Sequence, residues 1–107
     1  MVIEVVVEGT ERPPAGAPLV VQVLDTTYAD APAQVVAHTS AHVASDEGET
    51  LQTVEIAFTP TGTADYRIRA HVDVDADGAV SLGDFVTTAA YPATGRDPVR
   101  VAVRKVT

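Results

Sequence analysis

Alternation of apolar and polar residues between positions 66 and 74 constrains the fold of this chain more than any other feature. Apolar side chains occupy every second position from Tyr66 to Val74. The residues between them are all polar: Arg67, Arg69, His71 and Asp73. Successive side chains of a β-strand point to opposite faces, so this pattern predicts a strand with one buried face and one exposed face.

The same period of two recurs along the rest of the chain. It predicts strands at residues 3–8, 19–24, 34–43, 52–58, 66–74, 80–86, 87–91 and 99–104. A short helix is an alternative for 34–43, but its β-branched residues favour a strand. Gly, Pro and Asp residues fill the intervals between these segments. The chain is therefore predicted to be all-β, an antiparallel β-sandwich of about seven or eight short strands forming one domain, residues 1–107.

Large apolar residues identify the faces that should form the core. In the fourth strand, Gln52, Val54, Ile56 and Phe58 share one face, which we expect to be buried. Two further aromatic residues, Tyr66 and Phe85, are expected on inward faces. Tyr28 lies in a turn, where we expect it to pack beneath the turn, although it is the aromatic residue best suited to an exposed contact.

The charge and the cysteine count exclude several classes of function. Fifteen acidic residues stand against seven basic ones, which gives a net charge of −8. A negative field of that size repels phosphate backbones and anionic lipids, so we expect no nucleic-acid partner. The chain has no cysteine and therefore no disulfide or thiolate metal site.

No apolar run approaches the roughly 20 residues that a transmembrane helix requires. The chain begins directly with a strand pattern, and no basic segment followed by a cleavage site precedes it. As written, the sequence predicts a cytoplasmic protein. If a leader has been removed, the cell envelope or secretion is the expectation instead.

A cluster of acidic residues follows the strand that ends at Val74. Counted from Asp73 as place one, Asp75 and Asp77 take the third and fifth places and Gly78 takes the sixth. The remaining candidate ligands are the carbonyl of Ala79 and the side chains of Ser81 and Asp84, at the seventh, ninth and twelfth places. This spacing is typical of a loop that wraps Ca²⁺ in oxygen ligands.

A plain β-hairpin is the alternative for this stretch, because Asp77-Gly78 favours a type I′ turn. Asp84 is one methylene shorter than the glutamate usual at the twelfth place, and no helices are predicted beside the loop. If calcium binds, we expect a dissociation constant of roughly 10⁻⁴–10⁻³ M. The candidate cofactors are therefore none or Ca²⁺.

The sequence contains few arrangements of residues that are typical of catalytic sites. His38 and His42 lie four residues apart, which on a strand separates them by about 13 Å, too far to share a metal ion. Ser40 lies between them, but no nucleophile-elbow glycines surround it. All three histidines, including His71, are expected to be exposed. No phosphate-binding glycine-rich loop is present. These observations predict a protein that is not an enzyme.

One segment resembles the signature of a known family. Residues 16–32, GAPLVVQVLDTTYADAP, are similar to the apolar strand and "L-x-D-x-S/T-x-A-D-A-P" segment of the YbaY/YscW family. Further matches are residues 54–58, residues 66–70, the aspartate–glycine hairpin, Asp84 and Tyr91. The resemblance extends from about residue 9 to residue 103.

The YbaY/YscW family consists of small bacterial β-sandwich lipoproteins, some of which are pilotins of type III secretion that escort an outer-membrane secretin. The resemblance therefore implies a non-catalytic module that binds another protein. Two features depart from the family. The chain lacks the lipobox cysteine that would carry a lipid, and the hairpin after Val74 is more acidic than in the family.

Overall fold

The computed structural model describes residues 1–27, 30–44, 47–59, 65–93 and 98–107. These residues form eight β-strands and no helix, so the all-β prediction is confirmed. Among them there is also no helix long and apolar enough to cross a bilayer. The strands are β1 (Val2–Val7), β2 (Pro18–Asp25), β3 (Gln34–His42), β4 (Thr50–Glu55), β5 (Tyr66–Val72), β6 (Phe85–Thr87), β7 (Tyr91–Pro92) and β8 (Val99–Lys105).

All strands belong to one mixed sheet rather than to a strictly antiparallel sandwich. Their order is β3-β2-β5-β6-β8-β1-β4, and β7 pairs with β5 beyond the end of β6. The first and last strands run parallel, with Ile3 opposite Val99 and Val7 opposite Val103. Every other pairing is antiparallel. The antiparallel prediction fails here because hairpins join only neighbouring segments, whereas β1 and β8 are the two ends of the chain.

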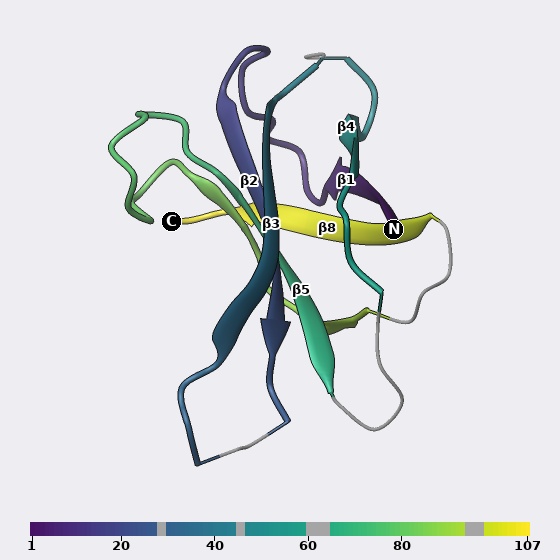
Figure 1. Cartoon of the computed structure of the whole chain (residues 1–107). Coiled ribbons are helices and arrows are strands. Elements are labelled where there is room, and N and C mark those ends of the chain that lie inside the picture. The colour runs from purple at the N-terminus through teal and green to yellow at the C-terminus, as the bar shows by residue number, and fades with distance from the viewer. Residues whose placement is uncertain (28–29, 45–46, 60–64, 94–97) are drawn as a thin grey trace.

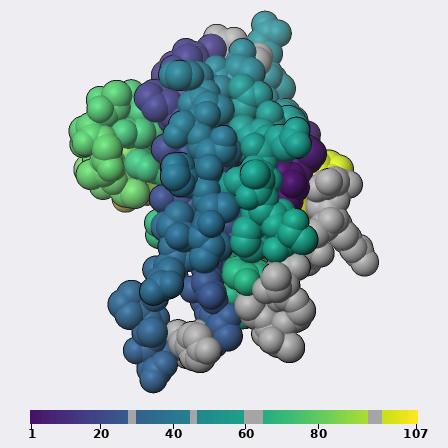
Figure 2. Space-filling model, in the orientation of Figure 1, coloured from purple at the N-terminus to yellow at the C-terminus, as the bar shows by residue number. Residues whose placement is uncertain are grey.

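The sheet curls until its two edge strands meet, so the domain is nearly a barrel. Figure 1 shows β8 crossing at a steep angle behind β2, β3 and β5. The edges β3 and β4 lie side by side on the surface in Figure 2. Two hydrogen bonds join them at one end: Ala44 N to Leu51 O, 2.8 Å, and Gln52 Nε2 to His42 O, 2.9 Å. The curl encloses one core between the two halves of the sheet.

Side chains from strands throughout the sheet fill this core. The fully buried members are Ile3, Val5, Leu19, Val21, Val23, Leu51, Ala70, Val72, Val101 and Val103. Phe85 is buried as predicted. Phe58 and Tyr66 are partly buried against the core and meet edge to face, with ring centroids 4.8 Å apart. Aromatic pairs prefer this geometry because the positive edge of one ring meets the negative face of the other.

A β-bulge corrects the predicted core face of β4. Val5 pairs with Gln52 and Val6 with Thr50, so Leu51 is an additional residue between two rungs. The bulge turns Leu51 into the core, where it is fully buried. Gln52, predicted to be buried, instead reaches the backbone of β3. Val54 and Ile56 are buried as predicted.

The segment after β5 differs most from the predicted strands. β5 ends at Val72, and β6 begins only at Phe85. The predicted strand at 80–86 is therefore wrong in its first half, where Val80 and Leu82 are 60% and 78% exposed. Of the predicted strand at 87–91, only the two end residues are in strands: Thr87 belongs to β6 and Tyr91 to β7. Residues 73–84 form instead a long loop, which we call the acidic loop.

Candidate functional site

The acidic loop stands out as a lobe at the side of the sheet (Figure 2), and its Asp84 contacts His71 of β5. Its position changes the surroundings of two side chains that strand alternation predicted to be exposed. Asp73 is only 7% exposed. The side chain of His71 is 18% exposed and contacts Asp84. Both predictions of exposure are corrected, because the loop covers this end of β5.

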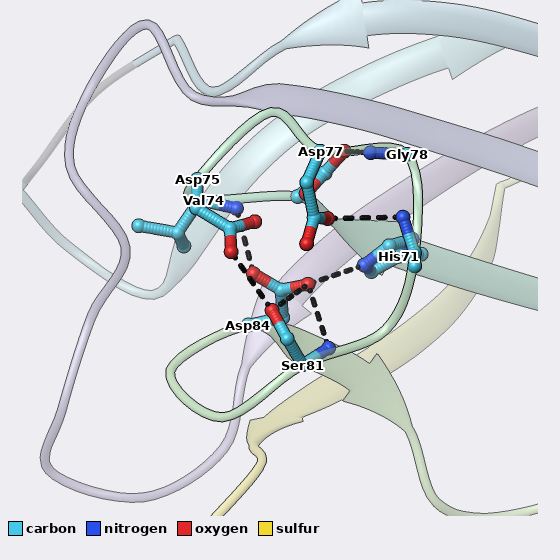
Figure 3. A network of polar contacts seen from close by, with 9 residues as sticks. His71, Val74, Asp75, Asp77, Gly78, Ser81 and Asp84 are labelled. Atoms are coloured by element: carbon cyan, nitrogen blue, oxygen red, sulfur yellow. Dashed lines mark hydrogen bonds and ion pairs between the residues drawn. The ribbon is translucent and has the colours of Figure 1, made fainter.

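Asp84 is the centre of the polar contacts that hold the loop (Figure 3). Its carboxylate is 1% exposed. Oδ2 lies 2.9 Å from Nε2 of His71 and accepts the N–H of Ser81 at 3.2 Å. Oδ1 accepts the N–H of Val74 at 2.9 Å. This buried side chain therefore ties the end of the loop both to its beginning and to strand β5.

The other acidic residues make fewer contacts. Asp73 Oδ2 accepts the N–H of Gly78 at 2.7 Å. Asp77 Oδ1 accepts the N–H of Ala79 at 3.0 Å. The hydroxyl of Ser81 donates to Asp75 Oδ2 at 3.0 Å and lies 3.4 Å from Asp84 Oδ2. Ala79 thus contributes its N–H to this network, and the role of its carbonyl as a ligand stays a prediction.

The structure brings the four predicted aspartate ligands together. Each of Asp73, Asp75, Asp77 and Asp84 offers one carboxylate oxygen, and these four oxygens lie within 4.8 Å of one another. His71 is the only basic side chain in the described part of the chain that pairs with any of them. Asp73 Oδ1 is buried and has no hydrogen-bond partner among the described residues. The cluster therefore concentrates negative charge with little compensation.

Hydrogen bonds keep two of these carboxyls in the charged form. Burial raises the pKa of Asp84, but the hydrogen bonds from His71, Ser81 and Val74 outweigh it, and the pKa of Asp84 lies below its ordinary value. The Ser81 hydroxyl lowers the pKa of Asp75 below its ordinary value, although desolvation and the charge of Asp84 oppose it. Near neutral pH the carboxyls of Asp75 and Asp84 are therefore anionic.

The backbone of the loop is not that of a two-residue hairpin. Gly78 has φ of +81°, as the aspartate–glycine pattern indicates, but Ala76 also has a positive φ, +56°. Left-handed backbone is uncommon for alanine because its Cβ crowds the following carbonyl. The tight turn of the hairpin alternative is therefore wrong: β5 and β6 pair as an antiparallel hairpin, but residues 73–84 form a long loop between them.

A shallow groove of about 380 Å³ lies between the acidic loop and the outer face of the sheet. Its lining comes from β2, β5, β6 and the loop: Val20, Gln22, Arg69, His71, Gly78, Val80 and Val86. Gln22 pairs with Arg69 in the strand register. The guanidinium of Arg69 donates to Gln22 Oε1 from Nε at 3.1 Å and from Nη2 at 2.6 Å.

Sequence reasoning missed this groove, because its two sides come from strands distant in the chain. Alternation did place Arg69 on the exposed face of its strand, but it made no such prediction for Gln22. His38 and His42 are exposed on β3, as predicted. Ser40 is also exposed, between them. Tyr28, the candidate for an exposed aromatic contact, lies outside the described residues.

The fold and the site define a small, nearly closed β-barrel domain with an acidic loop and a groove on one side. This fold is similar to that of "an alternative pilotin from the type II secretion system of Vibrio cholerae". The two structures superpose with a TM-score of 0.76 at 20% sequence identity, over 100% of this chain and 96% of the pilotin chain. No protein-family model and no curated protein matches the chain. Membership of the YbaY/YscW family therefore stays a prediction.

Proposed function

We propose that this domain is a non-catalytic assembly module that binds a segment of another protein in the groove beside the acidic loop. The observation that carries the proposal is the groove itself, which combines the exposed Val80 and the half-buried Val20 and Val86 with an arginine. Val80 is 60% exposed at its rim. Exposed apolar surface of this kind is typical of contact sites.

Arg69 indicates the chemistry of the partner. The Nε and Nη2 donors of its guanidinium both point at one neutral amide oxygen of Gln22. No ion pair joins Arg69 to a carboxylate within the described ranges. A carboxylate offers two oxygens to these two donors and a full negative charge, so it is a stronger acceptor than the amide. The preferred segment therefore carries an apolar side chain beside a carboxylate.

Two sets of negative charge oppose this pairing: remote acidic residues that contribute to the net charge of −8, and the acidic loop that forms one wall of the groove. At physiological ionic strength, screening limits the repulsion from charges farther away than about 8 Å. The similarity to a pilotin and the family resemblance together support a secretin as the partner. We further propose that the protein acts in the cell envelope, as expected of a pilotin.

Direct binding tests the proposal. Labelled peptides that cover the secretins encoded in the source genome are titrated with the purified domain, and fluorescence anisotropy gives Kd. Arg69→Gln is expected to weaken binding by about tenfold, which corresponds to about 1.4 kcal/mol. Arg104→Gln is the matched control, because Arg104 is an exposed arginine on β8 outside the groove. If no segment binds, or if both variants bind equally well, the proposal is wrong.

A further inference from the structure

The acidic loop also has the properties of a cation site, and this inference does not depend on the proposed partner. Four carboxylates converge within 4.8 Å, and an acidic cluster alone is common on protein surfaces. The decisive observation is Asp73. Its carboxylate is almost completely buried, one oxygen is held by Gly78, and the other has no partner among the described residues.

A buried carboxylate oxygen without a donor is costly, by roughly 1–3 kcal/mol or more for a charged group. The neighbouring groups make this cost larger, because they are carboxylates rather than donors. A bound cation removes both penalties at once, since it coordinates the unpartnered oxygen and neutralises the repulsion. We therefore propose that the loop binds a divalent cation through the carboxylates of Asp73, Asp75, Asp77 and Asp84.

The donor set favours Ca²⁺ over other divalent ions. The converging atoms are carboxylate oxygens, and the hydroxyl of Ser81 lies beside two of them. Hard oxygen donors suit Ca²⁺, which accepts six to eight ligands in irregular geometry, whereas Mg²⁺ requires a near-ideal octahedron. His71 would favour a transition metal, but its Nε2 is already engaged with Asp84. Gly78 and Val80 of this loop also line the groove, so a bound ion would order one groove wall.

Thermal unfolding of the whole domain tests this site. The melting temperature is measured after chelator treatment, then with CaCl₂, MgCl₂ or ZnCl₂. At a calcium concentration ten times Kd, we expect an increase of about 5 °C, and a smaller one with magnesium. A calcium concentration of about 10 mM reaches this ratio for the weakest expected affinity.

Two variants separate a specific site from general attraction of cations to an acidic protein. Asp73→Asn is expected to abolish the calcium shift. Without calcium it should be at least as stable as the wild type. The amide oxygen still accepts the N–H of Gly78, and the amide NH₂ group replaces the unpartnered Oδ1 and can donate to the neighbouring carboxylates. Asp30→Asn removes the same charge from an exposed turn outside the cluster and should keep the full shift.

Asp77→Asn serves the same purpose if Asp73→Asn does not fold, because Asp77 is exposed. The proposal is overturned if calcium causes no shift at about 10 mM. It is also overturned if Asp30→Asn loses the shift as fully as Asp73→Asn does. A larger shift with zinc that His71→Gln removes would overturn the calcium assignment. None of these outcomes bears on secretin binding.

Discussion

At the scale of single residues, two buried aspartates in one loop have opposite environments. Asp84 accepts hydrogen bonds on both oxygens and contacts His71. Asp73 is nearly as buried, yet one of its oxygens has no partner among the described residues. Burial of a carboxylate is tolerated when donors replace its water, and it is a cost when they do not. Asp84 therefore stabilises the loop, and Asp73 is the residue on which the proposed cation site depends.

The first prediction concerns Asp84→Asn in calcium-free buffer. The amide has one acceptor oxygen, so its NH₂ group must face a donor that now contacts the carboxylate. We expect the free energy of unfolding to fall by about 2 kcal/mol, the scale for hydrogen bonds to a charged group. Urea unfolding measures this loss.

Asp77→Asn is the control for this measurement. The Asp77 side chain is exposed, and its hydrogen bond is to the N–H of Ala79. A change within about 0.5 kcal/mol is expected for such a surface position. Equal effects of the two substitutions would show that the contacts of Asp84 do not hold the loop.

At the scale of elements, the acidic loop takes the place of the tight turn that the hairpin alternative predicted, and it carries backbone strain. Ala76 adopts a φ of +56° between two of the clustered aspartates. Positive φ at a residue other than glycine costs of order 1 kcal/mol and persists where the surroundings enforce it. The loop therefore keeps a conformation that brings the aspartates together at the expense of local stability.

The second prediction is that Ala76→Gly stabilises the domain. Glycine adopts positive φ without steric conflict, and we expect the free energy of unfolding to rise by about 0.5–1 kcal/mol. Ala79→Gly is the matched control in the same loop, because Ala79 is exposed and has no positive φ. There the greater freedom of the unfolded chain should lower stability. A loss of stability in both variants would contradict the prediction.

At the scale of the whole molecule, the last strand connects the two halves of the sheet. β8 lies between β6 and β1 in the strand order. Along that order, it is the strand that joins β3, β2, β5 and β6 on one side to β1 and β4 on the other. Val101 and Val103 of β8 are fully buried in the core. The chain therefore completes its fold only when its two ends pair, which makes the topology strongly non-local.

The third prediction is that deletion of residues 99–107 abolishes cooperative unfolding. The deletion leaves β1 and β6 each without a hydrogen-bonded neighbour on the side that now faces β8. It also removes two fully buried valines, Val101 and Val103. We expect far-UV circular dichroism to show no sharp thermal transition. Deletion of Thr107 alone, which is exposed, is expected to leave the transition unchanged. A cooperative transition near the original temperature after the longer deletion would contradict this view.

Much of the fold could be predicted, because strand alternation is local. The inward residues Ile68, Ala70 and Val72 are buried, and the long strands lie near their predicted positions. The prediction failed at Gln52, where a bulge shifts the alternation by one residue. It also failed at Val80 and Leu82, because an apolar pair at a spacing of two does not distinguish a strand from an exposed loop.

The candidate site was predictable to a similar degree. The spacing of the aspartates in the sequence indicated that Asp73, Asp75, Asp77 and Asp84 converge, and their oxygens do. The contact of His71 with Asp84 was not predictable, because alternation placed His71 in solvent and only the folded loop covers it. The pairing of Gln22 with Arg69 likewise depends on the register between β2 and β5.

The sequence by itself determined the long strands, the left-handed glycine at position 78 and the spacing of the acidic residues, because each is set by neighbours along the chain. Only the tertiary structure decided the parallel pairing of β1 with β8, the curl of the sheet and the burial of Asp73. These features depend on contacts between residues far apart in the sequence. Such contacts form only when the whole strand order is in place, so no local pattern encodes them.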